Sequence, residues 1–94
     1  MENNEKPIKE IVKDPEWQKI RQELVGNWKD RPNWCCMKLR YYLGHVQSAS
    51  MDKLRIEMNY LTGTAFRLGI IKPPCAVKLR KEISAEIKRR KNLK

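Results

Sequence analysis

A single stretch in the middle of the chain, residues 51–71, most constrains what the rest can fold into. Its apolar residues recur in alternating steps of three and four, at Met51, Leu54, Met58, Leu61, Ala65 and Leu68. That spacing places them along one side of an α-helix, and such a stripe has to pack against another element. One interpretation is therefore a continuous helix that presents a single apolar seam to a partner helix.

The same apolar positions also fit two helices joined by a turn near Asn59. The Asn, Tyr, Thr and Gly residues in the run from 59 to 63 are weak helix formers, which favours this break. Asn59 would take the left-handed turn position, and Tyr60 would fill the corner between the helices. The second helix would present three polar side chains outward, those of Thr62, Thr64 and Arg67. The stretch is thus similar to a generic helix-turn-helix, although Arg55 stands where a small residue usually lets the two helices approach.

Capping residues predict two helices before this stretch. Asp14 followed by Pro15 is typical of a helix start, because the aspartate side chain accepts a backbone N–H bond and proline needs no N–H donor there. The apolar stripe that follows predicts a helix over residues 15–29. Asn33 can cap a second helix over residues 34–46.

Similar signals frame the central stretch and the end of the chain. Ser50 is a suitable N-cap for a helix that starts at Met51. Pro73 and Pro74 end the central stretch and open a last helix, whose apolar stripe continues to Ile87. No segment has the pattern of a β-strand. We therefore predict an all-α fold, a small bundle of four to five short helices, which contains a helix-turn-helix if the chain breaks at Asn59.

The polar ends of the chain suggest three parts. We expect residues 1–13 to form a flexible polar arm, residues 14–87 a single helical domain, and residues 88–94 a basic tail. Three apolar residues of the arm at helical spacing, Ile8, Ile11 and Val12, leave a short docking helix open as an alternative. The predicted core consists of Trp17, Ile20, Leu24, Leu39, Leu43, Leu54, Met58, Leu61, Leu68 and Ile83.

The three cysteines and the absence of a long apolar run bear on the environment of the protein. An odd cysteine count with two adjacent members, Cys35 and Cys36, is a poor framework for disulfides and is typical of a reducing compartment. We expect both to be small core or boundary residues. No apolar run approaches the length needed to cross a membrane. These patterns predict an intracellular, cytoplasmic protein without a membrane partner.

The positive charge of the chain is unevenly distributed. The formal net charge is +10, and it rises towards the C-terminus. Residues 1–30 carry six Lys/Arg and seven Asp/Glu, whereas residues 72–94 carry nine Lys/Arg and two Asp/Glu. In the last helix Glu82 can pair with Lys78 and Glu86 with Arg90, each four residues apart, as on an ordinary solvated helix face. No nearby acid balances the run of four adjacent cations that starts at Lys88. Such a gradient is typical of a surface that binds a polyanion, nucleic acid above all.

Catalytic and metal-binding chemistry have little support in the sequence. His45 is the single histidine, and no nucleophile, carboxylate pair or phosphate-binding loop accompanies it. Zinc ligation by Cys35, Cys36, Cys75 and His45 does not match the usual ligand spacing. We therefore expect a non-enzymatic protein with no cofactor and no metal.

The first functional hypothesis is a DNA-binding protein of the helix-turn-helix type, a regulatory or accessory factor. In it, Lys53, Arg55 and Lys72 contact phosphates, while Thr62, Thr64 and Arg67 approach base edges. The basic tail adds affinity that does not depend on sequence, through Lys88, Arg89, Arg90 and Lys91. Duplex DNA is favoured over RNA, and a homodimer or a larger assembly is expected.

The second hypothesis is a structural or assembly subunit of a larger protein or nucleoprotein particle. Its basic tail would lie along RNA or DNA without reading the sequence. The two hypotheses differ in whether the isolated chain folds. A DNA-binding domain should fold alone, whereas an assembly subunit would become ordered only with its partners.

Overall fold

The computed structural model describes residues 6–64 and 74–93, which form helices and turns and contain no β-strand. Five α-helices occur in these residues, which confirms the all-α prediction. In chain order the elements are α1 (Ile8–Ile11), α2 (Pro15–Leu24), α3 (Pro32–Leu43), the 3-10 helix η1 (Val46–Ser48), α4 (Met51–Asn59), the π-helical turn η2 (Tyr60–Thr64) and α6 (Pro74–Lys91).

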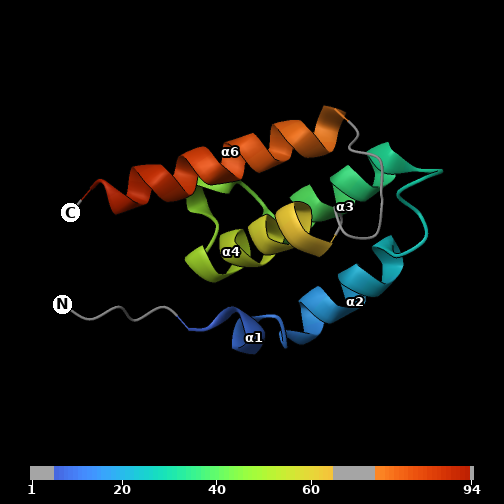
Figure 1. The fold of residues 1–94 in the computed structure, drawn as a ribbon, viewed down its shortest axis with the longest axis horizontal. Coiled ribbons are helices and arrows are strands. Elements are labelled where there is room, and N and C mark those ends of the chain that lie inside the picture. The colour runs from blue at the N-terminus through green and yellow to red at the C-terminus, as the bar shows by residue number, and fades with distance from the viewer. Residues whose placement is uncertain (1–5, 65–73, 94) are drawn as a thin grey trace.

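Helix α4 occupies the centre of the bundle. It packs against α1, α3 and α6, and α2 packs against α3. In Figure 1, α6 runs along one side of α4, and α1 and α2 lie on the other side. Helix α6, at the C-terminal end of the chain, is therefore separated from the N-terminal helices by α4.

The helix starts follow the capping signals. Asp14 accepts a hydrogen bond from the backbone N–H of Glu16 at 3.2 Å, and Ser50 Oγ accepts one from Lys53 N, also at 3.2 Å. These two predicted caps are confirmed. The predicted cap at Asn33 is wrong, because α3 begins one residue earlier, at Pro32, where proline suits the first helical position. The ends differ from the prediction: α2 stops at Leu24, before Gly26 with its φ of +85°, and α3 stops at Leu43. Local signals therefore placed the starts of helices better than their ends.

The core contains most of the residues that helical spacing selects. Eight predicted core residues are buried: Trp17, Ile20, Leu24, Leu39, Leu43, Leu54, Leu61 and Ile83. Met58 is only half-buried, and Leu68 lies outside the described residues. On α4 the buried side also includes Ile56 and Glu57, because this helix has neighbours on several sides. The apolar seam predicted for the central stretch is thus one edge of a more widely buried helix.

The predicted turn at Asn59 is wrong. Asn59 is the last residue of α4, Tyr60 has right-handed helical angles (φ −64°, ψ −46°), and no non-glycine residue in the described part of the chain has a positive φ. The chain continues from α4 into the π-helical turn η2. Tertiary packing explains this continuation, because the Tyr60 ring packs edge-on against Trp17 at 5.4 Å and its hydroxyl accepts a hydrogen bond from Trp28 Nε1 at 3.0 Å. The second helix of the expected motif would lie at residues 65–70, outside the described residues.

A disulfide joins Cys36 on α3 to Cys75 on α6, with their Cα atoms 6.3 Å apart. The expectation that the cysteines form no disulfide is therefore wrong, although Cys35 and Cys36 are both buried as predicted. Structural disulfides are typical of oxidising compartments, so this bond is at odds with the predicted reducing location. Among the described residues, none of the helices is both long enough and apolar enough to span a membrane.

Parts of the predicted N-terminal arm and of the predicted basic tail are helical. Residues 8–11 form α1, and Ile11 is buried against the core, which agrees with the alternative of a short docking helix. At the other end, α6 extends to Lys91, four residues beyond the end of its apolar stripe.

Candidate nucleic-acid interface

Helix α6 carries seven Lys/Arg residues and two Glu residues. Its 18 residues rise about 27 Å along the axis. The inward side carries Ala76, Leu79 and Ile83, which are buried in the core. The apolar stripe therefore fixes which side of the helix faces water, and the lysines lie on that side.

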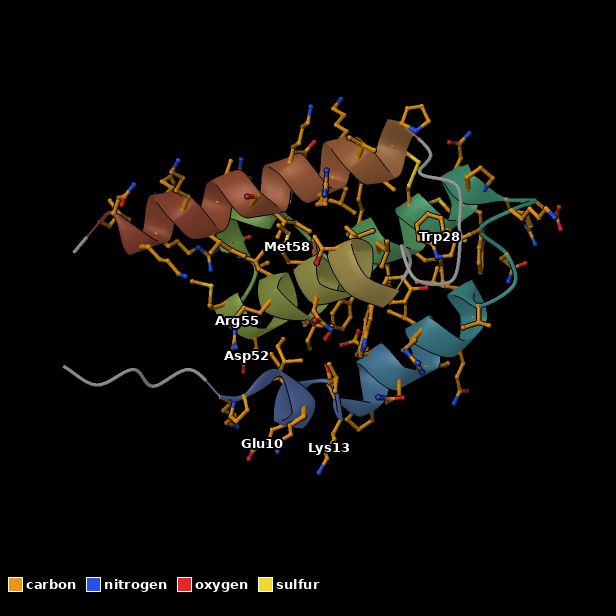
Figure 2. All side chains as sticks on the ribbon, viewed as in Figure 1. Glu10, Lys13, Trp28, Asp52, Arg55 and Met58 are labelled. Carbon is orange, nitrogen blue, oxygen red and sulfur yellow. A yellow bond between two sulfur atoms is a disulfide. The ribbon has the colours of Figure 1, made fainter. Side chains whose placement is uncertain are left out.

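Three lysines at the centre of the outer side are fully available to solvent: Lys78, Lys81 and Lys88. Within the described residues, none of the three makes a hydrogen bond or an ion pair with another side chain. Lys91 is also exposed, and it lies on the side of α6 that faces α4. Figure 2 shows the outer side chains of α6 pointing away from the bundle.

The two acidic residues of α6 are engaged in ion pairs. Glu82 accepts two parallel hydrogen bonds from Arg40 on α3, from Nη1 and Nη2, both at 3.1 Å. This bidentate contact holds the pKa of Glu82 below its usual range. It also fixes α6 beside α3. The charge of Lys78 lowers the pKa of Glu82 further, although Lys78 makes no hydrogen bond or ion pair with it.

Glu86 binds two arginines of the basic run. It accepts hydrogen bonds from Arg89 Nη2 at 2.6 Å and from Arg90 Nε at 2.7 Å, and these bonds lower the pKa of Glu86 to about 2. Arg90 also donates to the backbone oxygens of Val46 and Gln47, at 3.4 and 3.0 Å. The predicted pair of Glu86 with Arg90 is confirmed, and the prediction that no nearby acid balances the basic run is wrong. The cause is the helical continuation to Lys91, which brings both arginines within reach of Glu86.

The two cations of α4 that were predicted to contact phosphates, Lys53 and Arg55, bind groups of the N-terminal half of the bundle. Lys53 Nζ donates to the backbone oxygen of Tyr42 at 3.1 Å, pairs with Glu16 at 3.5 Å and sits 4.6 Å from the Tyr42 ring centroid. Arg55 donates to the backbone oxygen of Lys6. In Figure 2, Arg55 lies on the side of α4 that faces α1, away from the outer side of α6. Both cations tie α4 to the N-terminal half of the bundle.

The predicted base-reading residues are not assembled on a recognition helix within the described structure. Thr62 is exposed, and its hydroxyl donates to the backbone oxygen of Met58 at 2.8 Å. Thr64 is the last residue of η2. Arg67 and Lys72 lie outside the described residues.

Spacing in the sequence predicted a pair of Lys78 with Glu82, and neither Lys78 nor Lys81 was among the predicted site residues. A signal for them was present: Lys78, Lys81 and Lys88 fall at steps of three and seven, so they share one side of a helix. What the sequence could not show is that Glu82 forms its ion pair with Arg40 on α3 and not with Lys78.

The N-terminal half of the bundle has a different electrostatic character. Exposed or half-buried acids occur along α1, α2 and the start of α4, including Glu10, Glu16, Glu23 and Asp52. Glu10 and Asp52 lie on the side of α4 opposite α6 in Figure 2. Residues 6–30 carry six Lys/Arg and five Asp/Glu, whereas residues 74–93 carry seven Lys/Arg and two Asp/Glu, so the excess of positive charge is greater on α6 than in the N-terminal helices.

Comparisons with protein-family models, curated proteins and solved structures found no match to this chain. Among residues 6–64 and 74–93, no group of three or more His, Cys, Asp or Glu side chains could hold a metal ion.

Proposed function

We propose that this protein is a non-enzymatic nucleic-acid-binding protein that contacts the phosphate backbone through the outer side of α6. The observation that carries the proposal is the row of three exposed, unpaired lysines, Lys78, Lys81 and Lys88, on a helix whose own acids are already bound to arginines. Unpaired lysines on one rigid helix gain free energy by displacing condensed counterions from a polyanion.

Duplex DNA is the favoured partner. Helix α6 contains no aromatic residue, so its outer side offers no stacking platform for unpaired bases. Its rigid row of cations suits the regular phosphate spacing of a double helix. The proposal does not include base reading by Thr62, Thr64 and Arg67, because α4 does not turn at Asn59. Binding is therefore expected to depend strongly on salt and weakly on sequence.

The test compares two triple variants of the full chain. One replaces Lys78, Lys81 and Lys88 by alanine, and the matched control replaces Lys13, Lys19 and Lys29, three exposed lysines from the N-terminal half. Both variants lose the same net charge. Binding of a labelled random-sequence duplex is followed by fluorescence anisotropy over a series of salt concentrations.

The α6 variant should lower the slope of log K against log salt by about 2–3, since each phosphate contact to duplex DNA contributes about 0.9. The control variant should change the slope by less than about 1. Equal losses in the two variants would mean that only net charge matters, and the α6 interface would be rejected. Tighter binding to single strands than to the duplex would reject duplex DNA as the partner.

A further inference from the structure

The side of α3 that points away from the core carries three large side chains that water reaches. Trp34 is half-buried, Met37 is 57% exposed and Tyr41 is 75% exposed. Steps of three and four residues place them in one stripe along the helix, about 10 Å from the first to the last. Tryptophan, methionine and tyrosine are enriched in contacts between proteins, so this stripe has the composition of an interface.

The charges beside this stripe balance, unlike those of the chain as a whole. A hollow between α2 and α3 borders the stripe at Met37 and Tyr41. Its charged lining consists of two lysines and two glutamates: Lys19, Lys38, Glu16 and Glu23. Because the chain has a net charge of +10, two copies repel each other through most of their surface, and they can approach most readily at a face that is locally neutral. A polyanion gains little from such a face.

The antiparallel course of α2 and α3 decides which charge lies at which end of the stripe. Lys38 pairs with Glu23, near the C-terminal end of α2, at 3.1 Å. Further along α3, the Tyr42 hydroxyl donates to the side chain of Asp14, just before α2, at 2.7 Å. The early residues of α2, Glu16 among them, therefore lie beside the late residues of α3.

The two ends of the stripe carry opposite charges. At the Trp34 end, the Arg31 guanidinium lies 5.0 Å from the ring centroid. Arg31 is exposed and makes no ion pair within residues 6–64 and 74–93. At the Tyr41 end, Glu16 pairs with Lys53 through Oε1 at 3.5 Å, and 53% of the Glu16 side chain is still exposed. A base thus lies at one end of the stripe and an accessible carboxylate at the other.

We infer that two copies of this chain associate through this stripe, with α3 of one protomer antiparallel to α3 of its partner. A two-fold axis near Met37 brings Trp34 of each protomer onto the partner's Tyr41, so the aromatic contact forms twice. The same axis brings each Arg31 towards the partner's Glu16. A second copy fits better than an unrelated acidic or basic partner, because the charges at the two ends match those of the same stripe turned end to end. The inference does not depend on nucleic-acid binding by α6.

Sedimentation equilibrium of the full chain, free of nucleic acid, measures the association over a series of concentrations. The wild-type chain should show a reversible equilibrium between monomer and dimer. Met37→Glu places two like charges on either side of the axis and should weaken the dimer by at least about tenfold. The matched control Leu93→Glu makes the same change at another exposed apolar side chain, 68% exposed, and should leave the dimer unchanged. Circular dichroism establishes that both variants are folded.

An exchange of charges tests the antiparallel arrangement and replaces the first comparison if Met37→Glu does not fold. Arg31→Glu and Glu16→Arg should each weaken the dimer by about tenfold, since each change places like charges together at two symmetric contacts. The double variant again sets a base opposite an acid and keeps the net charge of the wild type, so it should recover most of the affinity. A double variant that is no tighter than the single variants would overturn the arrangement.

Three further results would overturn the inference. The first is a chain that stays monomeric up to about 1 mM. The second is a dimer that Leu93→Glu abolishes and Met37→Glu leaves intact. The third is a monomeric chain in which single-stranded DNA shifts the NMR signal of the Trp34 indole, which would make unpaired bases the occupant. The triple alanine variant at Lys78, Lys81 and Lys88 should dimerise like the wild type, so a failure of nucleic-acid binding is distinguishable from a failure of this inference.

Discussion

Glu57 is the most unusual residue of the structure. Its side chain is 0% exposed on the central helix, and within residues 6–64 and 74–93 neither carboxylate oxygen has a hydrogen-bond partner. Burial raises the pKa of Glu57 well above its usual value, and the charges of Arg40 and Lys53 oppose that rise only in part. Glu57 therefore holds its proton in the folded protein at pH values where the unfolded chain has lost it.

We expect the stability of the protein to reflect this difference. Below about pH 4.5 the carboxyl is protonated in both states. Above that pH the unfolded chain ionises first, so the free energy of unfolding falls by about 1.4 kcal/mol per pH unit until the pKa of the folded state is reached. Glu57→Gln should abolish this loss. In urea titrations the variant should be more stable than wild type at pH 7 and about equal at pH 4, and an unchanged difference across that range would contradict the assignment.

At the scale of the element, the two ends of α4 are stabilised in different ways, the first by a capping hydrogen bond and the second by burial of side chains. Ser50 satisfies the N–H of Lys53 at the start of α4, whereas the other end continues into η2, where Tyr60 and Leu61 are buried. The run from 59 to 63 contains several residues of low helix propensity. It stays helical because the burial of Tyr60 and Leu61 contributes more free energy than the low propensity costs.

The cap at Ser50 can be tested directly. Ser50→Ala removes the acceptor of the Lys53 N–H, and we expect a loss of about 0.5–2 kcal/mol in the free energy of unfolding. The control is Ser84→Ala, at an exposed position within α6, which should be neutral or slightly stabilising because alanine is the better helix former. Chemical denaturation of both variants gives the comparison. Equal effects would mean that the cap contributes nothing to the stability of α4.

At the scale of the whole molecule, two links hold α6 against α3. The disulfide Cys36–Cys75 joins them near their N-terminal ends, and the ion pair between Arg40 and Glu82 joins them further along. Both links fix the orientation of α6 relative to α3, and with it the direction in which the lysines that we propose for nucleic-acid binding point.

The disulfide connects residues 39 positions apart, and loop entropy gives it a stabilisation of about 4 kcal/mol. We expect a reducing agent to lower the melting temperature of the oxidised protein, because the unfolded chain gains freedom when the link is opened. The double variant Cys36→Ser, Cys75→Ser should melt at a similarly low temperature and should not respond to the reductant. Cys35 is the single cysteine that remains in this variant, so no other disulfide can form within the chain. A melting temperature that does not respond to reductant in the wild-type chain would contradict a stabilising role.

Much of the fold could be read from short-range patterns. Asp14 with Pro15, Ser50, and Pro74 mark helix starts that the structure confirms, because a cap depends on hydrogen bonds between residues two or three positions apart. The spacing of apolar residues selected most of the core for a similar reason, since one turn of a helix brings residues three and four apart onto the same side.

The residues of the candidate site could be predicted less well from such patterns. The charge gradient pointed to the C-terminal region, but it did not distinguish the exposed Lys78, Lys81 and Lys88 from the paired Arg89 and Arg90. It also selected Lys53 on α4, which the structure directs towards Tyr42 and Glu16. Which cation remains available depends on where each acid points once the helices have packed.

The sequence by itself determined the all-α class, the helix starts and the direction of the charge gradient, because each follows from local periodicity, capping or composition. The tertiary structure alone decided that Asn59 stays helical, that Cys36 pairs with Cys75 and that Glu57 is buried. These three outcomes depend on contacts between segments far apart in the chain. Burial and distance between such segments are set by the packing of whole helices, and a pattern that extends over a few residues carries no information about them.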